Sequence, residues 1–422
     1  MATSHRRHGA AAAAAVVGLA GLLLASCSSG TPSASSTSTS GGTGKSPITI
    51  GYISDLTGVA SSTFADGAGG ARARIDLQNA EGGVDGHPLK LVVEDDQSSP
   101  TVNKTASQDL VQNKGAFGVI QFSAFTFGGA PYLQQEGVPV TGGAFDGPEW
   151  AQEPNSNMFS FAPLVDAEIQ GKYYGSNATA NVLKAIGGDK TAGLAYGISA
   201  SSQQSIRVVF AGGATQCYKN FSVPFGGVDF TADVLAIKSQ GCNGVVGSFV
   251  DSSDIALAQA VKNAGIDAKQ IYFTGYDQQV LDSPAARAAL DGAYMQAAIN
   301  FTTPNAAVRN MLNTIKRYDP SYKGGIPDLG LYGSYVSADL MITGLQMAAS
   351  DITRANFISK LRTLHNYTAG GILPSGTPMT GFGTEAIVPK TLCAYYMQLK
   401  GTQFVVYSGK AVCGSRIVVP SS

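Results

Sequence analysis

Short apolar runs and segments with helical spacing alternate along the first part of the chain. The apolar runs predict strands at Ile48–Ile53, Leu89–Glu94 and Phe117–Phe122, with a fourth strand starting at Val138. Between the strands, 64–80 and 101–113 carry apolar residues at the spacing of a helix face. Strands that alternate with helices of this length are typical of βαβ crossovers, so this part of the chain predicts a parallel sheet.

The same alternation starts again near residue 192. It predicts strands at 192–196, 221–223, 244–249 and 271–273, and helices at 201–211, 231–238 and 254–264. Near the C-terminus, Thr391–Leu399 and Gln403–Ser408 predict a hairpin. The predicted fold class is therefore α/β, with two doubly wound domains. Ligands of such open sheets bind beyond the carboxyl ends of the strands, which predicts a site in the cleft between the domains.

The N-terminus has the features of an export signal. Two arginines, at positions 6 and 7, precede an apolar run from Ala10 to Leu24 that has the length of a signal-peptide core and is short for a membrane span. The next residues, Leu24-Ala25-Ser26-Cys27, resemble a bacterial lipobox, in which the cysteine becomes the lipidated N-terminus. We therefore expect 1–26 to be a signal peptide, with an ordinary signal peptide and a chance cysteine as the alternative.

Residues 27–46 are mostly Ser, Thr, Gly and Pro, a composition that buries too little apolar surface to fold and predicts a lipidated flexible tether. Together with the lipobox, it places the rest of the chain outside the cytoplasm. We expect the protein to be anchored to the outer face of the cell membrane by lipidated Cys27.

Charge and composition exclude several classes of protein. The formal net charge is −1 and 14% of the residues are charged, so no basic stripe is available and nucleic acid is not expected as a partner. Among the five cysteines and four histidines no CxxC or HxxxH spacing occurs, so we expect no metal and no cofactor. No GxSxG motif occurs and no histidine lies in a predicted cleft loop, which favours a binding protein over an enzyme.

Four cysteines remain once Cys27 is assigned to the lipid. An even number in an exported chain predicts two disulfides, and four cysteines allow three pairings. We favour the pairs that are local in sequence, Cys217 with Cys242 and Cys393 with Cys413. Four buried free thiols are the alternative.

Several motifs, in one consistent order, resemble those of type I periplasmic binding proteins. They are Gly51–Gly58, Asn79–Gly86 and Val92–Pro100, followed by shorter matches at 116–120, 136–140, 228–231, 261–265 and 332–335. The most similar branch is the leucine/isoleucine/valine-binding group, which serves ABC importers. The resemblance covers nearly the whole mature chain.

This resemblance implies two Rossmann-like lobes joined by three hinge crossovers, which close on a ligand. Lobe 1 would comprise 47–165 plus 298–388, and lobe 2 would comprise 166–297 plus 389–422. The implied function is to capture a small molecule and deliver it to the permease and ATPase of an ABC importer. A ligand-sensing receptor subunit that acts with a membrane partner is the alternative, and we expect a monomer in either case.

The resemblance also implies where the ligand binds. In the amino-acid-binding members, hydroxyls and amides of two lobe 1 loops hold the ligand carboxylate, and lobe 2 completes the site. The residues at the matching positions of this chain are Ser123, Phe125, Thr126, Phe127, Ala144, Phe145, Tyr196, Ser201, Val250, Tyr276 and Asp277.

The matching loops depart from the amino-acid binders. Phe125, Phe127 and Phe145 crowd the place of the carboxylate, and a phenylalanine donates no hydrogen bond, so the loops predict an apolar or aromatic ligand. An amino acid held by main-chain amides is the alternative. Asp277 falls where the amino-acid binders place a carboxylate against the ligand ammonium, and it equally suits a turn after a strand.

Overall fold

The computed structural model describes residues 45–143, 145–151, 154–162, 168–169, 172–374 and 390–420. The predicted signal peptide, the predicted lipidation site Cys27, nearly all of the predicted tether and the predicted site residue Ala144 lie outside these ranges. Within them, no helix combines the length and the apolar character that a membrane span requires.

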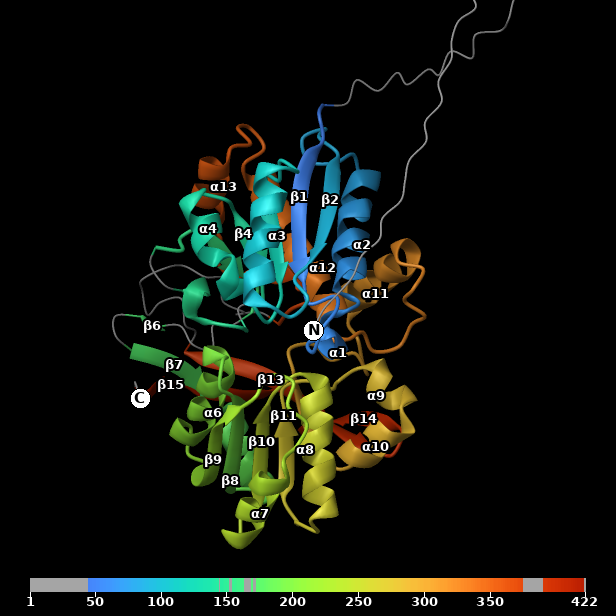
Figure 1. Cartoon of the computed structure of the whole chain (residues 1–422). Helices are drawn as coiled ribbons and strands as arrows, with labels where there is room; N and C mark the ends of the chain where they lie inside the picture. The colour runs from blue at the N-terminus through green and yellow to red at the C-terminus, as the bar shows by residue number, and fades with distance from the viewer. Residues whose placement is uncertain are drawn as a thin grey trace, which may run out of the picture. The chain divides into compact units, whose positions relative to one another are not determined.

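The first lobe is built on a parallel sheet with the strand order β2-β1-β3-β4-β5 (Figure 1). The interior strand β1 is buried along almost its whole length because helices cover both faces of the sheet. The strands are β1 (Ile48–Ser54), β2 (Leu89–Asp95), β3 (Gly118–Phe122), β4 (Val140–Gly142) and β5 (Met158–Ser160). The helices are α1 (Ser61–Phe64), α2 (Gly67–Ala80), α3 (Pro100–Gln112), α4 (Ala130–Gln135), α11 (Ala306–Tyr318), α12 (Leu329–Met347) and α13 (Arg354–Leu361).

The second lobe is built on a larger sheet with the order β6-β7-β15-β13-β12-β11-β10-β8-β9, and β14 pairs with β13. The strands are β6 (Glu168–Ile169), β7 (Lys172–Ser176), β8 (Lys190–Tyr196), β9 (Thr215–Val223), β10 (Gly244–Ser248), β11 (Lys269–Tyr272), β12 (Tyr294–Ala297), β13 (Thr391–Lys400), β14 (Gln403–Val406) and β15 (Val412–Val419). The helices are α5 (Ala178–Ile186), α6 (Ala200–Ala211), α7 (Thr231–Ser239), α8 (Asp251–Asn263), α9 (Gln278–Asp282) and α10 (Pro284–Leu290).

The two sheets share one topology. Strands β9-β8-β10-β11-β12 are parallel and repeat the order of the first sheet, whereas β13, β15 and β7 add antiparallel strands. Along the described elements the chain passes between the lobes three times: after β5, after β12 and before β13. This arrangement confirms the predicted α/β fold of two Rossmann-like lobes. The predicted lobe boundaries at 165 and 388 lie outside the described ranges, and the one at 297 stays a prediction.

Side chains at the helix starts fix where several helices begin. Ser99 accepts a hydrogen bond from the backbone N–H of Val102 at the start of α3, and Ser199 accepts one from Ser202 at the start of α6. Because the first N–H groups of a helix have no partner within it, such caps stabilise the helix start by about 1 kcal/mol. Pro100 at the first position of α3 also favours the start of this helix, because its fixed φ angle suits a helix.

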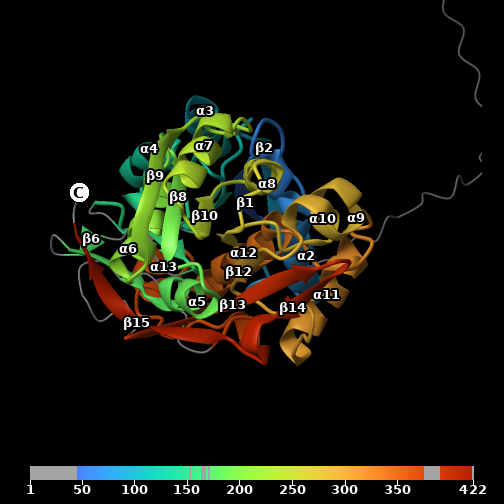
Figure 2. The ribbon, with the colours of Figure 1, turned by 90° about the horizontal axis from the view of Figure 1, so that it is seen from below.

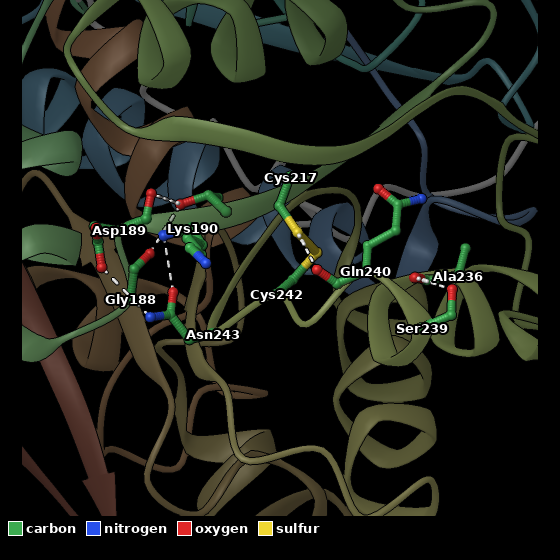
Figure 3. Close-up of a disulfide and its surroundings, with 10 residues drawn as sticks. Gly188, Asp189, Lys190, Cys217, Ala236, Ser239, Gln240, Cys242 and Asn243 are labelled. Atoms are coloured by element: carbon green, nitrogen blue, oxygen red, sulfur yellow. Dashed lines mark hydrogen bonds between the residues drawn. A yellow bond between two sulfur atoms is a disulfide. The ribbon is translucent and has the colours of Figure 1, made fainter.

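Two disulfides tie parts of the second lobe together. Cys217 of the edge strand β9 is bonded to Cys242, just before β10, as Figure 3 shows. Cys393 of β13 is bonded to Cys413 of β15, its partner in the strand register. The predicted pairing is therefore confirmed.

Three predicted elements differ from the structure by more than two residues. The helix predicted at 64–80 is two helices, α1 and α2, separated by Ala65 and Asp66. The strand predicted at 221–223 is the end of the longer β9, whose mostly polar, half-exposed residues gave no apolar signal. The helix predicted from residue 254 begins at Asp251.

Candidate functional site

A cavity of about 180 Å³ lies between the two lobes. Its lining comes from the segments that follow the carboxyl ends of strands in both sheets, where open α/β sheets bind their ligands. The first lobe contributes Thr63, Phe64, Ala124, Phe145, Asp146 and Leu329, and the second contributes Tyr196, Ser199, Ser202, Ser205, Phe225, Ser248, Phe249, Val250, Phe273 and Thr274.

Stacked phenylalanine rings form the wall in the first lobe. The ring of Phe145 stacks on that of Phe64 with centroids 5.4 Å apart, and it meets Phe122 edge-on at 4.9 Å. Phe122 is fully buried beneath them. These separations are those of favourable aromatic pairs, so the wall is preformed and presents rings to the cavity.

Three further rings form the opposite wall. The ring centroid of Tyr196 lies 4.5 Å from that of Phe225 and 4.6 Å from that of Phe249. The Tyr196 hydroxyl donates to Ser253 Oγ at 2.8 Å and accepts from the backbone N–H of Val250 at 3.2 Å. Burial raises the pKa of Tyr196, so the phenol stays neutral.

Most polar side chains of the lining are already paired within the protein. Ser202 Oγ donates to the Ser248 carbonyl at 2.6 Å and accepts from the N–H of Tyr196. Thr274 Oγ1 donates to the buried carboxylate of Asp254 at 2.9 Å. No lysine or arginine is among the described lining residues. The cavity is therefore chiefly apolar and lacks a cationic group for an anion.

The loop after β3 also has few donors to offer. The N–H of Ala124 donates to Asp55 Oδ2 at 2.8 Å, that of Phe125 to Ser123 Oγ at 2.9 Å, and that of Phe127 to Asp146 Oδ2 at 3.2 Å. Three of the four amides at 124–127 thus bind the protein's own oxygens.

Asp55 and Asp146, which accept hydrogen bonds from two of these amides, are both buried. Burial, with the nearby charge of Asp96, raises the pKa of Asp55 to about 8, and burial also raises the pKa of Asp146. Asp146 additionally accepts from the Trp150 indole at 2.8 Å. A ligand carboxylate at this loop would meet protein acids in place of free donors.

Direct contacts join the lobes around the cavity. Ser201 Oγ donates to the Phe145 carbonyl. Thr63 Oγ1 donates to Asp251 Oδ2 at 3.1 Å and accepts from the Asp251 N–H at 3.0 Å. The rings of Phe125 and Phe225 lie 4.7 Å apart. The lobes are therefore closed on each other in this structure.

The structure places three of the predicted site residues, Phe145, Tyr196 and Val250, on the cavity. Ser201 and Phe125 lie at contacts between the lobes, as described above. Phe127 lines a separate hollow of about 360 Å³ that also includes Ile198. For each of these, ligand contact stays a prediction.

The other predicted residues are engaged elsewhere. Ser123 and Thr126 are fully buried, and their hydroxyls donate to Asp96 and to the Ser123 carbonyl within the first lobe. The Tyr276 hydroxyl accepts from the N–H of Phe301 at 2.9 Å. Asp277 caps α9 by accepting from Val280 N–H at 2.8 Å, and neither Tyr276 nor Asp277 is among the described lining residues.

Sequence reasoning missed Phe64, Phe225 and Phe273, and it selected Val250 but not the neighbouring Phe249. Phe225, Phe249 and Phe273 follow β9, β10 and β11 within the segments that lead to the next helix, whereas Phe64 is the last residue of α1, the helix after β1. The rule that sites lie beyond the carboxyl ends of parallel strands was enough to nominate them.

Comparisons with known proteins agree with this architecture. The chain matches the family model described as Periplasmic binding protein over residues 47–402. No curated protein matches it in sequence.

Three solved structures of low identity share the fold. A branched-chain amino acid ABC transporter protein from Thermus thermophilus with bound valine is 15% identical, with a TM-score of 0.69, over 86% of this chain and 95% of that one. An ABC transporter solute-binding protein from R. palustris in complex with benzoate is 16% identical, with a TM-score of 0.69, over 88% and 97%. A fatty acid ABC transporter substrate-binding protein from Thermomonospora curvata is 16% identical, with a TM-score of 0.67, over 86% and 92%. Since the family model covers most of its length, this chain belongs to the periplasmic binding protein family.

Proposed function

We propose that this chain is an extracytoplasmic, lipid-anchored solute-binding protein that holds a small molecule between its lobes and delivers it to an ABC importer. The observation that carries the proposal is the cavity lined by aromatic rings from both lobes. A binding role, without catalysis, follows from a site that is chiefly apolar and whose polar side chains are mostly hydrogen-bonded within the protein.

The ligand that this cavity suits best is uncharged and contains a single ring. An apolar cavity of about 150 Å³ holds benzene, so the volume of about 180 Å³ suits one ring with a small substituent. A free carboxylate would lose its hydration and find few donors, at a cost of several kcal/mol. An aromatic ring instead gains about 0.5–1.5 kcal/mol per ring pair beyond its buried area.

We therefore expect benzamide to bind more tightly than benzoate, leucine or valine, as measured by calorimetry. Phe145→Ala removes a ring from the wall of the cavity and should weaken benzamide binding by about tenfold or more, since ring contact and burial are both lost. Phe221→Ala is the matched control because Phe221 lies on β9, outside the described lining of the cavity.

The opposite pattern would restore the amino-acid alternative. Tight binding of leucine or valine that is unaffected by Phe145→Ala and abolished by Asp277→Ala would contradict an uncharged aromatic ligand. It would also place the charged contact where the resemblance to amino-acid binders implied it.

The lipid anchor is tested separately. Cys27→Ser removes the thiol that would carry the acyl chains, so most of the protein is expected to move from the membrane fraction to the soluble fraction of fractionated cells. Ser29→Thr, in the predicted tether, leaves the whole lipobox unchanged and serves as the control. A Cys27→Ser protein that stays membrane-bound and processed like the wild type would rule out this anchor.

A further inference from the structure

A second cavity, of about 170 Å³, lies in the second lobe beside the cavity between the lobes. It is bounded by β7, α5, α6 and β13, and Figure 2 shows α5 and α6 next to the red C-terminal strands. Its apolar walls include Val208, Val209 and Leu392. Ser205 and Phe273 line both cavities, so the two cavities adjoin at these residues.

One face of α6 runs past both cavities. Ser202, Ser205 and Val208 are three residues apart and therefore lie on the same side of the helix. Ser202 lines the first cavity, Ser205 lines both cavities, and Val208 lines the second. From Ser202 to Val208 the helix rises by about 9 Å along its axis. The face thus changes from hydroxyl groups at the cleft to apolar groups in the second cavity.

The polar groups at the junction differ in what they can still bind. In the second cavity, Thr179 Oγ1 is hydrogen-bonded to the Tyr396 hydroxyl at 2.8 Å and donates to Gln296 Oε1 at 3.2 Å. The Ser205 hydroxyl, by contrast, makes no hydrogen bond to any part of the chain that the structure describes. One polar atom of a ligand can therefore form a hydrogen bond with the Ser205 hydroxyl at the junction. The second cavity beyond Ser205 favours an apolar group of the ligand.

We propose that the second cavity receives an apolar tail of the ligand whose ring occupies the first cavity. This inference rests on the proposed binding of a neutral ring between the lobes and extends it. The ligand class is then a single aromatic ring, a polar linking group within reach of Ser205, and an alkyl chain of several carbons, as in an N-alkyl amide of an aromatic acid.

Benzamide and N-butylbenzamide test this inference by calorimetry on the full mature protein. Each methylene buried in the second cavity tightens binding by up to about fourfold, which corresponds to about 0.8 kcal/mol. We expect N-butylbenzamide to bind at least about tenfold more tightly than benzamide, since ordering the chain offsets part of this gain.

The variant Ala394→Leu fills the second cavity from β13, where Ala394 is half-buried in its wall. It should abolish the advantage of the butyl compound and leave the benzamide affinity within about threefold of wild type. Ala211→Leu, at the exposed end of α6 and outside both described linings, makes the same substitution as a control and should keep the advantage.

Equal affinities of the two compounds for wild type would overturn the inference. So would a butyl advantage that survives in Ala394→Leu, or an Ala394→Leu variant that loses affinity equally for both compounds. Retained benzamide binding shows that Ala394→Leu is folded. If neither compound binds wild type, the proposed ligand class fails and this inference fails with it, whereas benzamide binding without a butyl advantage overturns the inference alone.

Discussion

Gly70→Ala is expected to destabilise the first lobe by about 3 kcal/mol or more, as measured by urea unfolding. Gly70 lies in α2 where this helix packs against α12, and a Cβ atom built on it would come within 1.9 Å of the Leu331 carbonyl oxygen. Because that oxygen belongs to the backbone of a buried helix, one helix would have to move away from the other. Overpacking that displaces backbone is among the more costly core substitutions.

Gly69→Ala, one residue earlier in the same helix, is the matched control. Its Cβ would meet Asp319 Oδ2, which is the end of a side chain and not backbone, and alanine is the better helix former by about 1 kcal/mol. We expect a change within about 1 kcal/mol of wild type. Similar losses for both variants would show that the close approach at Gly70 does not set the packing of these helices.

Asp55→Asn is expected to flatten the dependence of stability on pH. The carboxyl of Asp55 is fully buried, and burial with the charge of Asp96 raises its pKa from 3.8 to about 8. Between these two values the folded chain holds a proton that the unfolded chain releases, so stability falls as pH rises from about 4 to 8. The asparagine amide cannot ionise, yet its oxygen can still accept the Ala124 N–H.

The variant should therefore match wild type near pH 4 and exceed it at pH 8 by on the order of a few kcal/mol. Urea unfolding at pH 5 and pH 8 measures this difference. Burial also raises the pKa of the carboxyls of Asp96, Asp251, Asp254 and Asp328, so a residual slope of the same sign should remain.

Asp85→Asn is the control for this series. Asp85 is exposed, and its hydrogen bond with Lys45 lowers its pKa, so it stays ionised throughout the range from pH 5 to 8. Its replacement should leave the slope unchanged. A wild-type slope of the opposite sign, or an Asp55→Asn slope equal to that of wild type, would mean that Asp55 does not carry a raised pKa.

The sequence predicted the fold well because buried parallel strands leave a local signal. Strands such as β1, β3 and β10 are short apolar runs bounded by turns, so their positions follow from the sequence alone. Strand β15 mixes exposed, half-buried and buried residues without a regular pattern within an antiparallel region, and it was not predicted. Its place depends on pairing with β13 and β7, far away in sequence.

The candidate site could be predicted only in part. Tyr196 and Phe145 each lie at or soon after the end of a strand, where the fold class predicts a site, and both line the cavity. Asp277 also follows a strand, but its carboxylate caps the next helix. The amides of the loop after β3 bind Asp55 and Asp146, which lie elsewhere in the sequence, so no local pattern showed that these donors are occupied.

The order of the strands bears on how the protein reaches its native state. Domains of a nascent chain usually fold in sequence, the N-terminal one first. Here α12, which packs against the first sheet, comes from the last third of the chain, and β13, an interior strand of the second sheet, comes from the last 32 residues. Neither lobe can therefore be completed before its late segment has been made. The first lobe must wait for residues 329–347 and the second for residues 391–400, so the Cys393–Cys413 bond can form only after the parallel strands of both sheets have been made.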